Sequence, residues 1–189
     1  FGNVGDSLRH AAFQGASIIS TTGLASTDFD KWPEFSRTLL VLLMFIGACA
    51  GSTGGAIKCS RVLLLLRAIR REIRQVIHPR AVNVVKLDGH VVDEKDLRST
   101  MIFFAAYIFI TLAATLLVSV DVFSCGSPFP AVVPCIGNVG PGLEMVGPMG
   151  NFSAFSGFSK LVLSLCMILG RLEIIPILVL FSGTAWKRS

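Results

Sequence analysis

Residues 37–74 read RTLLVLLMFIGACAGSTGGAIKCSRVLLLLRAIRREIR, in which two apolar half-helices flank a glycine-rich segment, residues 47–55. Each glycine weakens a helix by about 1 kcal/mol relative to alanine, so the sequence predicts that the helix is unwound in its middle. Unwound backbone at membrane depth is tolerated only where protein or a water-filled cavity satisfies its polar groups. The break inside an apolar segment therefore indicates a permeation path.

The stretch from Gly51 to Lys58 also has a superficial likeness to a phosphate-binding loop. Such a loop ends in Gly-Lys-Ser/Thr, whereas here Lys58 follows Ile57 and precedes Cys59, and no strand pattern leads into it. The spacing favours the membrane interpretation.

The composition indicates that the chain is embedded in lipid. Of its 189 residues, 52% are hydrophobic and 15% are charged, and the mean hydropathy is +0.70. The apolar blocks at 101–120 and 161–181 match the length needed to cross a hydrocarbon layer roughly 30 Å thick, which is about 20 helical residues. The predicted fold class is an all-α integral membrane protein.

The net charge is +5, and the basic residues gather in two places, the segment 58–80 and the last residues of the chain. Short loops rich in Lys and Arg stay in the cytoplasm, so residues 58–100 and the C-terminus are expected inside. A nucleic-acid-binding surface would interleave aromatic residues with the basic ones, and the basic segment has none. The charges therefore indicate a topology, and no nucleic-acid partner is expected.

The cysteines and histidines do not form a recognisable site. The five cysteines include no CxxC pair, which argues against a zinc site or a disulfide framework, although Cys125 and Cys135 leave one pairing open. His78 and His90 lie in the polar interval 78–100, which is predicted to be a cytoplasmic connector with a hairpin turn at Asp88-Gly89-His90. No cofactor is expected.

A short helix followed by a glycine loop occurs twice in the chain. The first helix, about residues 7–20, is too short to span a bilayer and precedes Thr21-Thr22-Gly23, and the second, residues 127–136, precedes a loop at 137–142. An apolar span follows each loop, so the order predicts a repeat of two re-entrant pore helices with their filter loops. Taken alone, the first helix fits a surface amphipathic helix equally well.

A potassium filter replaces the hydration shell of the ion with backbone carbonyls of an extended segment. Glycine permits the backbone conformations that this arrangement needs, and each loop has a glycine soon after its helix. The candidate filter residues are Thr21, Thr22, Gly23 and Leu24 in the first loop, and Asn138, Val139 and Gly140 in the second.

Arg171 and Glu173 lie within the last apolar span, residues 158–182. A charge at the bilayer centre costs about 2.5 to 3.5 kcal/mol on insertion scales, so both side chains should face protein or water. Because residues two apart on a helix point to nearly opposite sides, the two cannot both line the pore. We expect Arg171 to face the ion path near the glycine-rich break and Glu173 to pair with a neighbouring helix. The alternative is a buried ion pair that only fixes helix packing.

Five motifs follow one another along the chain. They are FQ-x5-STTG at 13–23, GACAGSTGGAIK at 47–58, GNVGPGL at 137–143, GNFS at 150–153 and GRLEIIP at 170–176. In sum and in order they resemble the Trk/Ktr/HKT superfamily, and within it most closely the bacterial Trk potassium uptake proteins. The resemblance runs essentially from end to end.

This resemblance implies four fused pore-loop units around one pore. The chain would supply the third unit without its first span, residues 1–77, and the whole fourth unit, residues 101–185, as a fragment of something longer. By position, Gly23 and Gly140 match filter glycines. The gate would consist of Gly47, Gly51, Ser52, Thr53, Gly54 and Gly55, which Arg171 approaches. Two departures stand beside these matches, because Leu24 replaces a frequent phenylalanine and Ala56 replaces a common glycine.

The function implied by the resemblance is potassium uptake across a bacterial inner membrane, by a homodimer that a cytosolic nucleotide-binding subunit gates. The lipid bilayer is then the surrounding medium, and potassium is the cargo of a protein that is no enzyme. Three alternatives stay open: a membrane-embedded enzyme, a non-conducting structural fragment, and a sodium-permeable member of the superfamily. An enzyme would need a nucleophile–base pair or a metal cluster at membrane depth.

Overall fold

The computed structural model describes residues 3–47, 55–78, 84–87, 89–120 and 128–172 of the chain. The helices are α1 (Val4–Ile19), α2 (Glu34–Phe45), α3 (Cys59–Ile77), α4 (Glu94–Ser119), α5 (Phe129–Gly137) and α6 (Gly157–Arg171). Two 3₁₀ turns, η1 (Phe29–Lys31) and η2 (Glu144–Val146), and the short strands β1 (Ile46–Gly47), β2 (Ile57–Lys58), β3 (Lys86–Leu87) and β4 (His90–Val91) complete the described elements. The predicted all-α class is confirmed.

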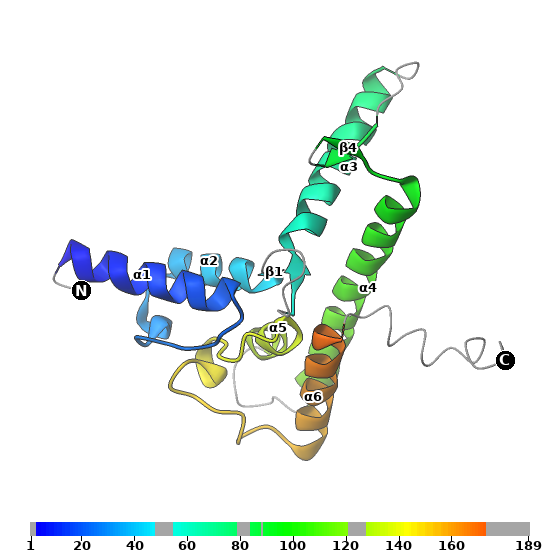
Figure 1. The fold of residues 1–189 in the computed structure, drawn as a ribbon. Helices are drawn as coiled ribbons and strands as arrows, with labels where there is room; N and C mark the ends of the chain where they lie inside the picture. Colours follow the sequence, from blue (N-terminus) through cyan, green and yellow to red (C-terminus); the bar gives the residue numbers. More distant parts are fainter. Residues whose placement is uncertain (1–2, 48–54, 79–83, 88, 121–127, 173–189) are drawn as a thin grey trace.

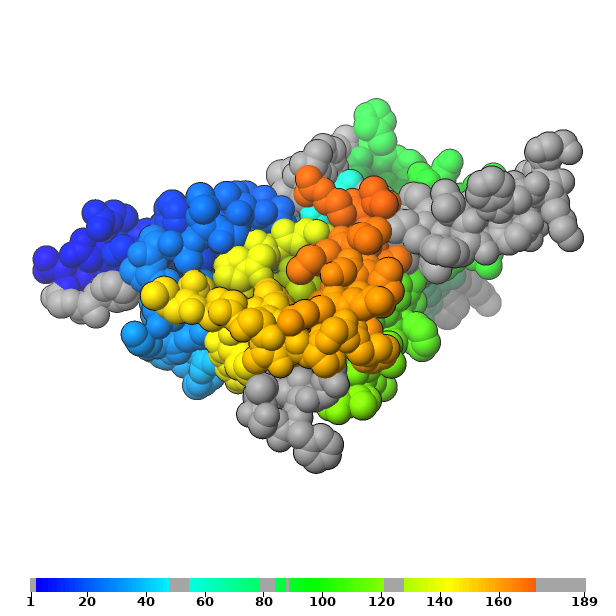
Figure 2. Space-filling view, turned by 90° about the horizontal axis from the view of Figure 1, so that it is seen from below, coloured from blue at the N-terminus to red at the C-terminus, as the bar shows by residue number. Residues whose placement is uncertain are grey.

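Helices α2, α4 and α6 pack around the short helix α5, which lies near the centre of the bundle in Figure 1. α1 and α2 lie side by side on one flank of α5, and α6 packs against both α5 and α4 on the other flank. α3 projects away from this bundle, with α4 running beside it. In the perpendicular view of Figure 2, α5 and the loop after it, in yellow, fill the space between the blue α1 and α2 and the orange α6.

α5 is buried because its sequence, FPAVVPCIG, is apolar all round, and a helix with no polar face has to be covered on every side. Every residue from Ala131 to Gly137 is buried. One core joins α5 to α4 and α6 and includes Tyr107 and Val132, and a second joins it to α1 and α2 through Val133. The position of α5 thus fixes the two flanks of the molecule relative to each other.

Within the part of the chain that the structure describes, α4 is the helix that is long and apolar enough to cross a membrane. It begins at Glu94, earlier than the span expected at 101–120. Thr111 and Thr115 lie in its apolar stretch, and each hydroxyl donates to the carbonyl four residues earlier, at 2.8 and 2.7 Å. These bonds satisfy polar groups that would otherwise be costly in lipid. The second expected span, 158–182, is represented by α6, and its continuation lies outside the described residues.

The helical break predicted around residues 47–55 is present. α2 ends at Phe45, and α3 starts at Cys59. The two ends are joined by a parallel bridge in which Ile46 pairs with Ile57 and Gly47 with Lys58. The Cys59 thiol also donates to the Gly47 carbonyl at 3.1 Å. The described ends of the glycine-rich segment, Gly47 and Gly55, therefore lie close together.

The predicted hairpin turn of the connector is also present, since β3 and β4 form an antiparallel pair. Val85, just before β3, packs with Leu64 and Ala68 of α3 and Leu97 of α4 in a third, smaller core. The hairpin is thereby fixed against the end of α3 that points away from α5 (Figure 1). Cys135, for which one disulfide pairing was open, is a free and buried thiol.

Candidate ion pathway

The two predicted filter loops have positive φ values at the same two positions. Thr21 and Asn138 each follow a short helix with a left-handed φ of 54°. Two positions later, Gly23 and Gly140 have φ values of +75° and +109°. A left-handed conformation is uncommon outside glycine, and for a β-branched threonine it is an outlier. The repeat that the sequence suggested in its motifs is therefore also a repeat of geometry.

Both short helices end in the same hydrogen-bonded cap. In α1, the amide of Thr21 donates to Ile18 O at 3.0 Å and the amide of Thr22 donates to Ser17 O at 2.9 Å. At the end of α5, Asn138 donates to Cys135 O at 3.2 Å and Val139 donates to Pro134 O at 3.0 Å. This pair of bonds is the Schellman motif, which requires the left-handed residue.

The two loops touch each other at their glycines. A Cβ added at Gly23 would overlap the Val139 carbonyl oxygen and lie 3.2 Å from Cδ of Pro141. The position of a Cβ at Gly140 lies 3.9 Å from the Cα of Gly23. Glycine is thus needed at Gly23 for space as well as for its φ, whereas at Gly140 the φ alone requires it.

Different side chains hold the two loops in place. In the first loop, the Ser17 hydroxyl donates to the Leu24 carbonyl at 2.7 Å, and the Ser20 and Thr22 hydroxyls share a bond of 2.7 Å. In the second, Asn138 Nδ2 donates to the Met167 carbonyl of α6 at 3.0 Å. The first loop is therefore fixed by its own pore helix, and the second by the neighbouring helix α6.

The described end of the glycine-rich segment meets the second loop. A Cβ at Gly55 would lie 2.6 Å from the Gly137 carbonyl oxygen and 2.9 Å from Asn138 Nδ2. Ala56, which replaces a glycine common in the resembled family, has a left-handed φ of 55°. That conformation explains why glycine suits the position.

Gly170 of α6 also lies close to Asn138. A Cβ there would overlap the Ile136 carbonyl oxygen and lie 2.8 Å from Asn138 Nδ2. Arg171 follows Gly170 directly, and its side chain is exposed within the described chain. Asn138 therefore lies close both to the described end of the glycine-rich segment and to the end of α6 that carries the candidate gate arginine.

Of the candidate gate residues, Gly47, Gly55 and Arg171 are described. The others, Gly51, Ser52, Thr53 and Gly54, lie outside the described residues, as does Glu173. Their predicted roles stay predictions.

The Asp30 carboxylate connects the segments that follow the two loops. Asp30 Oδ1 accepts a hydrogen bond from the Glu144 amide at 3.0 Å, and lies 3.9 Å from Nη2 of Arg37. Burial raises the pKa of the Asp30 carboxyl above its ordinary value of 3.8, and the bond from Glu144 and the charge of Arg37 offset part of this rise. A Cβ at Gly147 would overlap Asp30 Oδ2, so the loop after η2 closes tightly over this carboxylate. Asp30 thus fastens the segment after the first loop to the segment after the second.

Three of these contributors were not singled out from the sequence: Ser17, Asp30 and Gly170. Ser17 and Gly170 lie inside quoted motifs, so their presence was visible but their contacts were not. Asp30 bonds to a residue 114 positions away. A pattern limited to one or two helical turns contains no signal for such a partner.

Comparison with known proteins adds independent information. The family model described as "TrkH: Cation transport protein" matches residues 2–188. The Trk system potassium uptake protein TrkH of Salmonella typhimurium is 38% identical over 99% of this chain. The Trk system potassium uptake protein TrkG of Escherichia coli is 35% identical over 96% of it.

A solved structure has the same fold. The crystal structure of the potassium transporter TrkH from Vibrio parahaemolyticus superposes with a TM-score of 0.89 at 36% sequence identity, covering 98% of this chain and 39% of that one. The chain likewise spans 39% of the Salmonella relative and 37% of the Escherichia coli one. It corresponds to about two fifths of such a protein.

Proposed function

Because this chain belongs to the TrkH family of cation transport proteins, we propose that it forms the third and fourth pore-loop units of a potassium uptake protein. The observation that supports this most directly is the pair of loops after α1 and α5. They have positive φ values at corresponding positions and touch at Gly23 and Val139. Two matching loops in contact are what a filter assembled from successive units requires.

In the proposed mechanism, backbone carbonyls of residues 21–24 and 138–140 replace water around a passing potassium ion. The Schellman caps set the direction in which each loop leaves its helix, and the bonds from Ser17 and Asn138 prevent the loops from relaxing. Preset carbonyls can select between ions because they do not collapse freely onto a smaller one.

The proposed gate is the glycine-rich segment between α2 and α3, together with Arg171. Its two ends are close together at the bridge between β1 and β2, and Gly55 abuts the base of the second loop. A segment held at both ends can change its conformation without moving the filter. The position of Arg171 directly after Gly170 supports its placement near this segment.

We further propose that the intact protein is a homodimer in a bacterial inner membrane, regulated by a cytosolic nucleotide-binding subunit. The arginine-rich end of α3 and the β3–β4 hairpin would face the cytoplasm, in accordance with the positive-inside rule. Transport is preferred to catalysis because the curated relatives cited above are named as potassium uptake proteins.

The test uses the full-length protein reconstituted in liposomes, with potassium and sodium fluxes measured separately. Gly140→Ser should keep expression and lower the preference for potassium over sodium, since a Cβ disfavours the φ of +109°. Gly15→Ala is the matched control, because a Cβ at this glycine in α1 meets nothing within 4 Å. Sodium flux equal to potassium flux in the wild type would favour the sodium-permeable alternative, and unchanged ratios in Gly140→Ser would refute the filter assignment.

A further inference from the structure

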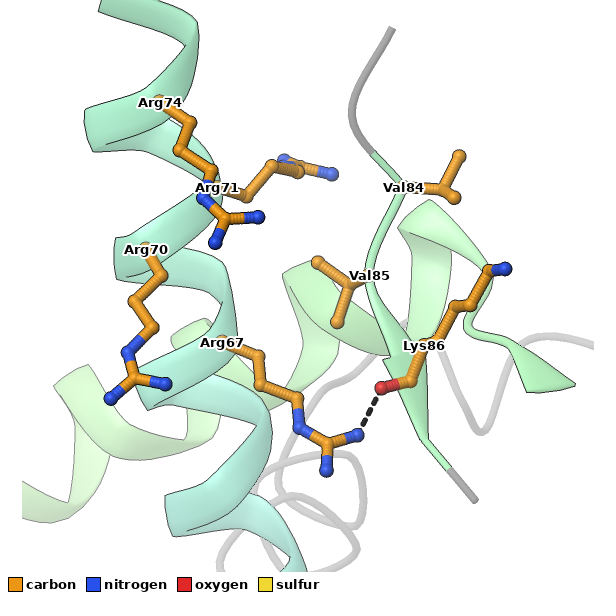
Figure 3. A pocket seen from close by; sticks show the side chains of 7 residues that line it. All are labelled: Arg67, Arg70, Arg71, Arg74, Val84, Val85 and Lys86. Atoms are coloured by element: carbon orange, nitrogen blue, oxygen red, sulfur yellow. Dashed lines mark hydrogen bonds between the residues drawn. The ribbon is translucent and has the colours of Figure 1, made fainter. Parts of the chain in front are cut away.

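The C-terminal half of α3 and the segment leading into β3 enclose a hollow of about 200 Å³. It is lined by Arg67, Arg70, Arg71, Arg74, Val84, Val85 and Lys86. The lining residues thus include five cationic side chains and no acidic one. In Figure 3, Arg67 and Arg71 extend from α3 toward the segment Val84–Lys86, whereas Arg70 and Arg74 run along the helix.

Contacts on both walls fix the hollow in shape. Arg67 donates to the carbonyl of Lys86, and Val85 is only 5% exposed in the core that it forms with α3 and α4. Arg71 bonds to Glu94 at the start of α4 and to Glu72 at 3.0 Å. These contacts hold the strand segment and the end of α4 against α3.

Glu72 and Glu94 both pair with Arg71, one of the arginines that line the hollow. Within the described residues, Arg70 and Arg74 form no ion pair, and both are exposed. Their guanidinium groups present planar sets of N–H donors, which suit the oxygens of a phosphate group. The unbalanced charge of the hollow therefore favours an anionic ligand.

The neighbouring face of α3 indicates where the phosphate comes from. Leu66, Ile69, Ile73 and Val76 follow one another at helical spacing and are 55%, 53%, 55% and 81% exposed. This apolar stripe lies about 100° around the helix from the arginines, because adjacent residues are offset by that angle. A helix with an apolar stripe beside a basic face suits a membrane surface, where acyl chains cover the stripe and headgroups meet the charges.

We propose that this hollow binds the headgroup phosphate of an anionic phospholipid from the cytoplasmic leaflet. Arg70 and Arg74, on the α3 wall, contact the phosphate oxygens. The acyl chains lie along Leu66, Ile69 and Ile73. Because the hairpin and α4 are both fastened to this part of α3, a bound lipid would brace the helix that follows the gate segment. The inference rests on the membrane orientation proposed above and is independent of ion conduction.

The test measures lipid binding to the delipidated full-length protein by native mass spectrometry, with phosphatidylglycerol compared with phosphatidylcholine. The wild type should retain phosphatidylglycerol preferentially. The double variant Arg70→Gln/Arg74→Gln should bind it about 25-fold more weakly, since each basic residue near an anionic membrane contributes roughly a factor of five. The matched control is Lys95→Gln/Arg98→Gln, which removes two exposed charges from the start of α4, outside the hollow. It should change binding by less than about twofold.

Further variants and a competition experiment distinguish the possible outcomes. Arg70→Lys/Arg74→Lys should retain most of the binding, because lysine still meets phosphate as a point charge. If the glutamine pair fails to fold, the single variant Arg74→Gln carries the test with an expected loss of about fivefold. Equal phosphatidylglycerol binding by the wild type and the glutamine variants would overturn the proposal. Displacement of the lipid by millimolar inorganic phosphate would identify a soluble anion as the ligand instead. Potassium flux is measured separately, so failure here leaves the pore assignment untouched.

Discussion

Thr21 and Asn138 are the residues that give the two loops their common shape. Neither is glycine, yet both have a φ of 54°. For a residue with a Cβ this conformation costs on the order of 1 kcal/mol or more, and such strain persists only where the surroundings enforce it. Asn138 recovers part of the cost through its bond to the Met167 carbonyl at 3.0 Å. At Thr21, the cap hydrogen bonds at the end of α1 offset part of the same conformational cost. Strain at two corresponding positions is consistent with a functional demand on the loops.

Arg171 gives the sharpest test at the residue scale. If its charge faces the ion path, Arg171→Gln in the full-length protein should raise potassium conductance on the order of tenfold, because a unit charge about 10 Å away at an effective dielectric near 20 has that effect. If it only pairs with a buried acid, the variant should lose stability without any gain in flux. Flux per folded molecule and thermal stability in detergent, measured on one preparation, distinguish the two roles.

The raised pKa of Asp30 predicts that the stability of the folded protein depends on pH. Since burial raises its pKa in the folded protein, its contribution to stability is fully present below about pH 3.8 and is lost as the pH rises through the folded pKa. Asp30→Asn keeps an acceptor for the Glu144 amide and removes this titration. The melting temperature of the wild type minus that of the variant should therefore decrease as the pH rises from about 3.8 and then level off. Asp6→Asn, on the exposed face of α1, is the control. A difference that stays constant with pH would contradict the prediction.

At the scale of elements, the contact between α5 and α6 positions the second loop. Because Gly170 has no side chain, α6 can approach α5 so closely that the Gly170 Cα faces the Ile136 carbonyl and the Asn138 side chain. The same closeness lets Asn138 reach the Met167 carbonyl. The helix pair thus acts as one unit that presents Asn138 to the described end of the glycine-rich segment.

Gly170→Ala tests this arrangement. The new methyl group would overlap the Ile136 carbonyl, so α6 must shift, and overpacking of this kind costs typically about 1–3 kcal/mol. Gly157→Ala is the control on the same helix, because a Cβ there meets nothing within 4 Å. Thermal unfolding of the full-length protein in detergent should show a loss for Gly170→Ala alone. Equal melting temperatures for the two variants would mean that the helices can separate without penalty.

At the scale of the whole molecule, the described residues form a bundle around α5 and an arm made of α3, the β3–β4 hairpin and the start of α4. Two cores meet at α5 and hold both loops in the bundle, whereas a third core of Leu64, Ala68, Val85 and Leu97 secures the arm. Its helix α3 starts at Cys59, directly after β2, which follows the glycine-rich segment. A force on the arm is therefore transmitted along a helix to the proposed gate.

The segment 1–189 expressed alone should give no potassium flux, because two pore-loop units cannot surround an ion with carbonyls. Co-expression with the remaining three fifths of a full-length relative should restore uptake. Growth at low potassium of cells that lack their own uptake systems measures both outcomes. Flux from the segment alone would mean that it assembles a complete pore from its own copies.

The sequence by itself determined the features that depend on neighbouring residues. The length of the apolar block at 101–120 predicted α4 as a span, and the density of glycines predicted the break between α2 and α3. The recurring order of a short helix and a glycine loop predicted the loops at 21–24 and 137–142. The motifs also identified the family correctly. Each of these signals lies within a few helical turns, where side-chain type and backbone propensity act directly.

Only the tertiary structure decided which parts meet. Three contacts follow from the burial of α5 between two cores. Gly23 lies against Val139, Gly170 and Gly55 both lie close to Asn138, and Asp30 accepts a hydrogen bond from the Glu144 amide. An apolar run such as FPAVVPCIG requires burial but does not specify its neighbours. The neighbours are fixed by how several helices fill the same space, and no local pattern contains that information.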